Sequence, residues 1–212
     1  SGDVIKVLVA YTPTFADDSG NADNYLALAE AETNTSYANS GVNTRIEIVH
    51  QYETAYDDSG SFSTDLSSFF NTGTSHGSEV ADLRDQHNAD IVVLMTGNSS
   101  GYGTGCGRAS GIGVDADEAF AVAKEACGTG YYSFGHEIGH LIGARHIITQ
   151  DSNTTPFAYG HGYCNTTANT WRTVMAYNCP SNTGGPRVQQ WSNPDVTRDG
   201  DVTGTHDDEN NA

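Results

Sequence analysis

The segment SFGHEIGHLIGARH, residues 133–146, places three histidines and one glutamate within a short stretch of chain. On a helix, His136 and His140 are about one turn apart, roughly 6 Å along the axis, and project from the same face. Two imidazole nitrogens placed in this way can reach one metal ion at about 2.0–2.1 Å. Glu137 lies about 100° around the helix, close enough to act on a metal-bound water without being a ligand.

The third histidine, His146, would point away from this face if the helix continued. Gly143 removes that difficulty, because a glycine can take a positive φ and end the helix, so that the chain turns back toward the metal. Three histidine ligands leave one position open for water, as in catalytic zinc sites. The segment therefore predicts one catalytic zinc ion bound by His136, His140 and His146, with Glu137 as the base.

Two other interpretations of the segment remain open. A zinc-binding module without catalysis would capture peptides or stabilise the fold, but a structural site needs no adjacent base and closes its fourth position. A hydrolase that uses histidine and glutamate as an acid–base pair without zinc would give the third histidine no purpose. The remaining histidines are interpreted as ordinary surface residues. They are His50, His76, His87, His161 and His206.

Apolar patterns around this segment predict alternating strands and helices. A mostly apolar run is typical of a buried strand, and apolar residues at helical spacing before a glycine indicate a helix. Strand, helix, strand, helix, strand is the order of a sheet built from βαβ units. After residue 146 we expect few regular elements. The expected strands are 4–10, 44–53, 89–97, 107–114 and 118–126, and the expected helices are 22–41, 78–88 and the histidine segment.

Length and charge narrow the class of protein. A chain of 212 residues with 36% apolar content can bury one domain core. Its net charge of −18 repels phosphate backbones and anionic membranes, so we expect no nucleic-acid or membrane partner. No stretch approaches the ~20 apolar residues of a membrane span. The chain starts directly in a strand, as expected for a secreted protein after removal of its signal and pro-segment.

The chain has four cysteines, which allow three pairings. Proximity along the chain favours Cys106–Cys127 and Cys164–Cys179, which would tie loops on either side of the histidine segment. Two disulfides suit an oxidising, extracellular setting. Free buried thiols are the alternative.

The stretch HEIGHLIGARH, 136–146, resembles the zinc signature of the metzincin metallopeptidases. That clan also has a tight turn with a methionine below the zinc, and WRTVMAYNC, 171–179, supplies Met175 for this Met-turn; an ordinary core methionine is the alternative. Tyr177 matches the tyrosine that astacin-like and serralysin-like members offer as an additional zinc ligand and as a donor to the oxyanion. A buried structural tyrosine is the other possibility.

The resemblance extends over most of the chain. Ile147, directly after the third histidine, matches none of the residues usual in astacins, serralysins or reprolysins. However, VLVAYTP, AFAVAKEACGTGYYSFGHEIGH, YGHGYC and WRTVMAY together resemble secreted bacterial reprolysin-like peptidases, which include the peptidyl-Asp metalloendopeptidases. This implies a metzincin-like α/β (α+β) fold with a twisted five-stranded mixed sheet, helices, a zinc cleft and a small irregular C-terminal lobe. We expect one catalytic domain, 1–212, with lobes at 1–146 and 147–212.

The implied activity is that of a secreted, monomeric zinc endopeptidase acting on proteins or peptides. Zinc would act as the Lewis acid, Glu137 as the general base and Tyr177 as a possible second donor to the oxyanion. In metzincins an extended substrate pairs with the edge strand, which 107–113 would form here; a surface loop is the alternative. The residues implied in substrate binding on this strand are Arg108, Ala109, Ser110 and Gly111.

Two further segments bear on substrate specificity and on a second metal ion. The clan's main pocket lies between the zinc helix and the stretch after the Met-turn, here about 176–193. A preference for acidic side chains would require a cation, for which Arg187 is the candidate and Arg172 stands just before the stretch. Both could instead be surface residues that offset the acidic charge. The segment 195–210 is rich in oxygen ligands that could bind calcium, but it lacks EF-hand spacing, and a solvated acidic tail is the alternative.

Overall fold

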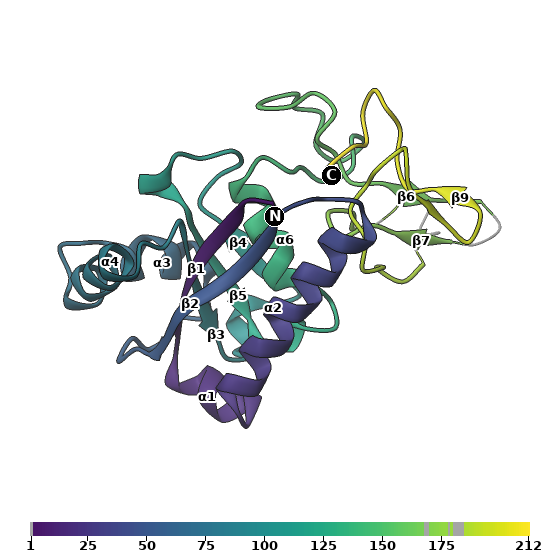
Figure 1. Ribbon diagram of the computed structural model, residues 1–212. Coiled ribbons are helices and arrows are strands. Elements are labelled where there is room, and N and C mark those ends of the chain that lie inside the picture. The colour runs from purple at the N-terminus through teal and green to yellow at the C-terminus, as the bar shows by residue number, and fades with distance from the viewer. Residues whose placement is uncertain (1, 168–169, 178, 180–184) are drawn as a thin grey trace.

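Five strands form one mixed sheet in the spatial order β2-β1-β3-β5-β4 (Figure 1). The first four run parallel to their neighbours, whereas β4 runs antiparallel to β5 at one edge. The computed structural model describes residues 2–167, 170–177, 179 and 185–212. The predicted five-stranded mixed sheet is confirmed. Its strands are β1 (Val4–Tyr11), β2 (Arg45–Glu53), β3 (Ile91–Thr96), β4 (Gly107–Ala109) and β5 (Phe120–Lys124).

The inner strands are buried on both faces. Along β1, Val7 and Val9 enter one core while Leu8 and Ala10 enter the other, because successive side chains of a strand alternate. Every residue of β3 is buried. Such continuous apolar strands are what a sheet covered on both sides requires.

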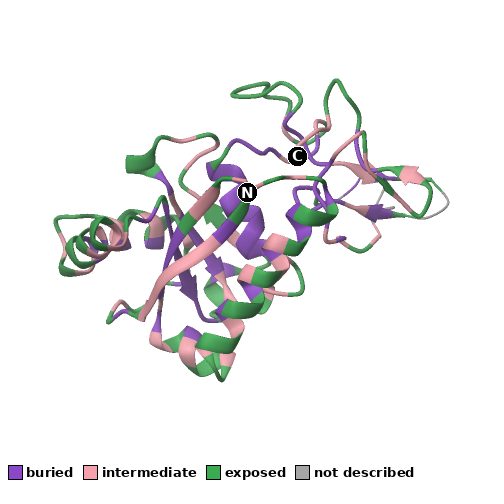
Figure 2. Ribbon diagram, viewed as in Figure 1, coloured by how far each residue is buried: buried purple, intermediate pink, exposed green. Residues whose placement is uncertain are grey.

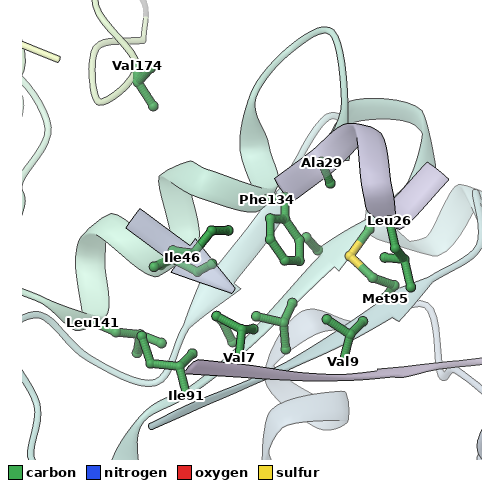
Figure 3. Packing of buried hydrophobic residues seen from close by; sticks show 14 of the residues in the cluster. Val7, Val9, Leu26, Ala29, Ile46, Ile91, Met95, Phe134, Leu141 and Val174 are labelled. Atoms are coloured by element: carbon green, nitrogen blue, oxygen red, sulfur yellow. The ribbon is translucent and has the colours of Figure 1, made fainter. Parts of the chain in front are cut away.

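Helices cover both faces of the sheet. α2 and α6 pack on the face that carries Val7 and Val9, where Leu26 and Phe134 fill the space between helices and strands (Figure 3). α3 and α4 cover the opposite face around the buried ring of Phe69. The helices are α1 (Pro13–Ser19), α2 (Ala22–Asn39), α3 (Phe62–Phe69), α4 (Ser75–His87), α5 (Glu125–Gly128) and α6 (Ser133–Leu141), with 3₁₀ turns η1 (Ser100–Tyr102) and η2 (Ala116–Glu118).

Every residue of α6 is buried, which sets this helix apart from the amphipathic surface helices (Figure 2). Two glycines allow its neighbours to come close. A Cβ at Gly135 would lie 2.9 Å from Oγ1 of Thr33 in α2, and a Cβ at Gly139 would lie 2.5 Å from the ring of Trp191. The sequence of α6 is therefore adapted to packing on every side.

The chain after α6 contains only short ribbons among its described residues. They are β6 (Cys164–Asn165) paired with β7 (Trp171–Arg172), and β8 (Thr197–Arg198) paired with β9 (Asp201–Val202). Both predicted disulfides, Cys106–Cys127 and Cys164–Cys179, are confirmed. No helix in the described part of the chain has the length and apolar character of a membrane span.

Two short helices, α1 and α3, occupy segments for which the sequence analysis predicts no element. α1 begins where the Thr12 hydroxyl accepts a hydrogen bond from the Phe15 N–H and Pro13 takes the first turn. α3 begins in a similar way at Ser61. Helices of seven and eight residues are too short for an apolar period to stand out.

The two strands nearest α6 are shorter than predicted. β4 ends at residue 109, and the Ser110 N–H makes the last backbone bond to β5, to the Phe120 carbonyl. Beyond it the N–H groups of Gly113 and Val114 donate to the carbonyls of His140 and Leu141 at the end of α6. β5 ends at residue 124, where the helical turn α5 begins. The segment after β4 therefore caps α6 instead of extending the sheet.

Substitution of Gly139 by alanine should destabilise the fold. The new Cβ would lie 2.5 Å from the fully buried Trp191 ring and 3.0 Å from the sulfur of Met175. We expect the free energy of unfolding to fall by about 1–3 kcal/mol, measured by urea denaturation. Adding Trp191→Phe should recover part of that loss because the smaller ring relieves the contact. Strictly additive losses in the double variant would show that the contact is not the cause.

Candidate metal centre

Three histidine nitrogens converge at the carboxyl end of α6. His136 and His140 project from the helix, and His146 returns from the chain that follows. Nε2 of His146 lies 3.1 Å from Nε2 of His136 and 3.0 Å from Nε2 of His140. Within the described ranges, no other group of three or more histidine, cysteine or acidic side chains is close enough to share a metal ion.

Backbone carbonyls determine which nitrogen of each helical imidazole faces the site. Nδ1 of His136 lies 2.8 Å from the carbonyl oxygen of Val174, and Nδ1 of His140 lies 2.8 Å from that of Ala144. A carbonyl oxygen only accepts, so Nδ1 carries the proton and Nε2 presents its lone pair. Such a second contact also orients the ring, as do the outer partners of metal-bound histidines.

The converging nitrogens form a site that suits a cation. Burial is the largest cause that lowers the pKa of all three histidines, in the case of His146 to about 3. At neutral pH the imidazoles are uncharged, so no additional proton offsets the repulsion between nitrogens 3.0–3.1 Å apart. A zinc ion about 2.0–2.1 Å from each nitrogen would do so. The three-histidine cluster therefore fits one zinc ion.

Gly143 turns the chain at the end of α6. Its φ is +112°, a conformation that costs glycine little. The Gly143 N–H donates to the carbonyl of His140 at 3.0 Å, and the Ala144 N–H donates to that of Gly139 at 2.8 Å. This pattern ends a helix and satisfies its last carbonyls. The turn directs the next residues toward the face that carries His136 and His140.

A tight turn around Met175 packs next to α6. The Ala176 N–H donates to the Thr173 carbonyl at 3.0 Å, which closes the turn. The Met175 side chain is fully buried, and its sulfur lies 3.0 Å from where a Cβ of Gly139 would be. The same turn supplies the carbonyl that orients the His136 ring. The turn thus fixes both the helix and one of its imidazoles.

The side chain of Glu137, which belongs to α6, is buried against β4, and only 5% of the residue's surface is exposed. The Ala109 N–H donates to its carboxylate. Gly107 leaves room for the side chain, because a Cβ there would lie 2.7 Å from both Cγ and Oε1 of Glu137. Burial raises the pKa of Glu137 to about 8, against the opposing effects of Arg187, the Ala109 N–H and Arg108. A carboxyl group with a pKa near neutrality is suited to accept and release protons.

Tyr177 stands at the mouth of the site. Its ring centroid lies 4.4 Å from that of His146, at an interplanar angle of 86°. The side chain is 37% exposed and lines the same cleft as the histidines. The alternative of a buried structural tyrosine is therefore wrong.

A cleft of about 710 Å³ contains these groups. Residues 104–112, including β4, form one wall, and α6 with His146 and Tyr177 forms much of the other. The residues that the sequence analysis proposes for substrate binding all line it: Arg108, Ala109, Ser110, Gly111 and Arg187. Within the predicted pocket stretch 176–193, residues 178 and 180–184 lie outside the described part of the chain.

Tyr131 is a cleft residue that sequence reasoning misses. The guanidinium carbon of Arg187 lies 4.5 Å from the centroid of its ring. The available signal was its place in a glycine-flanked tyrosine pair just before α6, in the segment GTGYYS. Gly107 is missed as well, because nothing in its local sequence indicates the contact with Glu137.

Comparison with known proteins identifies relatives over most of the sequence. Residues 1–192 match the model Reprolysin_5, described as metallo-peptidase family M12. A peptidyl-Asp metalloendopeptidase of Stenotrophomonas maltophilia is 45% identical over 199 residues, which cover 92% of this chain and 46% of that protein. One of Pseudomonas fragi is 40% identical over 168 residues, 79% of this chain and 86% of that protein.

The chain thus spans about half the length of the S. maltophilia relative and most of the P. fragi relative. A solved chain in the structure of a chaperone–substrate complex aligns with a TM-score of 0.73 at 18% identity. The alignment covers 99% of this chain and 32% of that one, and it shows a shared fold.

Zinc binding should depend on His146. We expect one zinc ion per wild-type chain after dialysis, measured by mass spectrometry of the metal. His146→Ala should weaken zinc binding by more than about 100-fold, since even the loss of an outer partner of a ligand costs up to that factor. His50→Ala, at a histidine of β2 outside the cleft, is the matched control and should keep its zinc. Equal zinc retention by both variants would contradict the site.

Proposed function

Because the chain belongs to metallopeptidase family M12, we propose that it is a zinc-dependent endopeptidase that hydrolyses peptide bonds in proteins or peptides. The observation that carries this proposal is the placement of a buried glutamate, Glu137, in the same cleft as the three converging histidines. A site that only stabilised the fold would need no base beside the metal.

Five residues of the cleft have a direct role in the proposed reaction. His136, His140 and His146 would hold the zinc ion, which when bound polarises a carbonyl and lowers the pKa of water from ~15.7 towards ~7. Glu137 would accept a proton from the attacking water and pass it to the leaving amine. The Tyr177 hydroxyl would donate a hydrogen bond to the developing oxyanion or bind the metal between turnovers.

The substrate would lie along β4. This strand is the edge of the sheet and pairs with β5 on one side only. An extended peptide can therefore add to its free side through backbone hydrogen bonds. Arg108, Ala109, Ser110 and Gly111 would form that contact, and the name of the relatives suggests a preference for aspartate beside the cleaved bond.

We further propose that the protein is secreted and acts as a monomer, without nucleic-acid or membrane partners. The two disulfides support an oxidising compartment, and the net charge of −18 disfavours anionic surfaces. One catalytic domain, 1–212, would consist of lobes 1–146 and 147–212, with the turn around Met175 as the Met-turn. Calcium binding by 195–210 stays a prediction.

Glu137→Gln should strongly reduce hydrolysis while zinc stays bound. Loss of the base should lower kcat/KM on unfolded casein by about 10²–10⁴-fold, because general acid–base catalysis contributes that much. Zinc chelation should have the same effect on the wild type. Glu47→Gln, at a half-exposed glutamate of β2, is the control and should retain activity. A wild type that binds zinc and casein yet cuts nothing would establish a peptide-binding module instead.

Gly107→Ala should impair catalysis without removing the metal. Its Cβ would lie 2.7 Å from Glu137 Cγ and 2.7 Å from the Val122 carbonyl oxygen, so β4 or the carboxylate must move. We expect kcat to fall by roughly 100-fold, in line with the cost of misplacing a catalytic group by about 1 Å. Unchanged kcat with a full zinc content would show that this close fit has no catalytic role.

A further inference from the structure

Two arginines share one tyrosine ring at the end of the cleft. The guanidinium carbons of Arg187 and Arg172 lie 4.5 and 5.7 Å from the centroid of the Tyr131 ring. Arg187 also donates to the Tyr131 carbonyl at 2.9 Å and to the Ala176 carbonyl at 3.3 Å. Arg172 donates to the Tyr131 hydroxyl at 2.6 Å and to the Gly185 carbonyl at 2.5 Å.

Neither arginine has a carboxylate partner among the described residues. The ion pairs found there involve Arg45, Arg145, Arg198 and His206. The residues outside the described ranges include no aspartate or glutamate. The buried Nε–H groups of Arg172 and Arg187 have no acceptor in the described structure either. In a chain with 27 acidic residues, two adjacent cations with no described carboxylate at ion-pair distance form an unsatisfied site.

The arrangement is anchored to α2 and is therefore held in place before a ligand arrives. The Gly130 N–H donates to both carboxylate oxygens of Glu32, at 3.1 and 2.9 Å, which fixes the residue before Tyr131. The Gln189 side chain donates to the Glu32 carbonyl at 2.8 Å, which fixes the segment after Arg187. A rigid guanidinium loses little freedom when it binds a carboxylate.

Arg187 faces the catalytic groups. It lines the cleft together with Glu137 and the three histidines, and its charge lowers the pKa of Glu137. Burial, with an added effect of Arg172, lowers the pKa of Arg187 itself to about 10, although Tyr131 and Glu137 oppose this. The group still carries its charge at neutral pH. A carboxylate that enters the cleft would therefore meet a positioned, partly desolvated cation.

We propose that Arg187 is the specificity-determining residue, which binds the carboxylate of an aspartate side chain next to the scissile bond, and that Tyr131 and Arg172 position it. This inference rests on the proposed peptidase activity and deepens it. The substrate supplies a carboxylate at ion-pair distance, which no described residue provides. Asparagine at the same position of the peptide would leave the cation unpaired, and the difference between the two peptides measures the interaction.

Arg108 is the competing cation. It also lines the cleft, but it is exposed on the edge strand β4, and its side chain has no hydrogen bond among the described contacts. An exposed charge in water contributes little to binding. A variant of Arg108 therefore tests the competing cation in the same cleft, and Arg45, an exposed arginine of β2, serves as the control outside it.

The test compares kcat/KM for four peptides that differ only at the residue beside the cleaved bond, which is Asp, Glu, Asn or Ala. We expect the wild type to favour Asp over Asn by on the order of 100-fold, the range measured for removal of one partner of a buried charge pair. Arg187→Gln should reduce this ratio to about 1–3, and Arg187→Lys, which keeps the charge but loses the planar fork, should give an intermediate ratio. Arg108→Gln and Arg45→Gln should keep the wild-type ratio.

The role of Tyr131 is tested by rescue. Tyr131→Ala removes the ring that both guanidiniums contact and should reduce the Asp-to-Asn ratio by about 10-fold, in KM more than in kcat, because the cation then moves freely. Tyr131→Phe keeps the ring and should restore most of the ratio. If Tyr131 had only a structural role, Tyr131→Ala would lower kcat/KM equally for the Asp and Asn peptides. Zinc content and thermal melting show whether each variant is folded.

The outcomes separate this inference from the proposed function. A wild type that cuts none of the peptides, nor casein, overturns the peptidase. A wild type that cuts all four peptides equally, or an Arg187→Gln variant that folds and keeps its aspartate preference, overturns the inference and leaves the peptidase standing. If Arg108→Gln instead of Arg187→Gln lost the aspartate preference, Arg108 would be the specificity-determining residue.

Discussion

The structure depends on holding three uncharged imidazoles together, with Nε2 of His146 3.0–3.1 Å from Nε2 of His136 and of His140 and all three ligand atoms within 4.8 Å of one another. Such a cluster needs rings that the chain holds in place and a cation bound between their nitrogens. The first requirement is met by backbone atoms: carbonyls of Val174 and Ala144 accept from two of the rings, and Gly143 turns the third into place. The second makes this cluster a metal site.

α6 is the element through which the rest of the protein acts on this cluster. The helix is buried along its length, between the sheet, α2, the turn around Met175 and the ring of Trp191. Small residues at the points of closest approach let these neighbours touch the helix. The same helix places Glu137 under the edge strand, where burial raises its pKa to about 8. Fold and site are therefore consequences of one packing arrangement.

Much of this arrangement could be predicted from the sequence, and the rest could not for a physical reason. The strands were visible as apolar runs, and the ligands as residues one helical turn apart before a glycine that can take a positive φ. Such features depend on neighbours within about ten residues. Gly107 under Glu137, and Tyr131 against Arg187 at a separation of 56 residues, depend on tertiary packing, which leaves no periodic signal. The short helices α1 and α3 were not predicted, because a helix of few turns shows no clear apolar period.

The account depends most directly on the metal geometry, and X-ray absorption at the zinc edge measures it. We predict three imidazole ligands at about 2.0–2.1 Å, with the remaining coordination made up of one or two oxygen atoms and no sulfur. That result would place the metal at the three histidines with a position open to water or substrate. Fewer than three imidazoles, or a coordination shell closed by four protein nitrogen or sulfur ligands, would contradict the account.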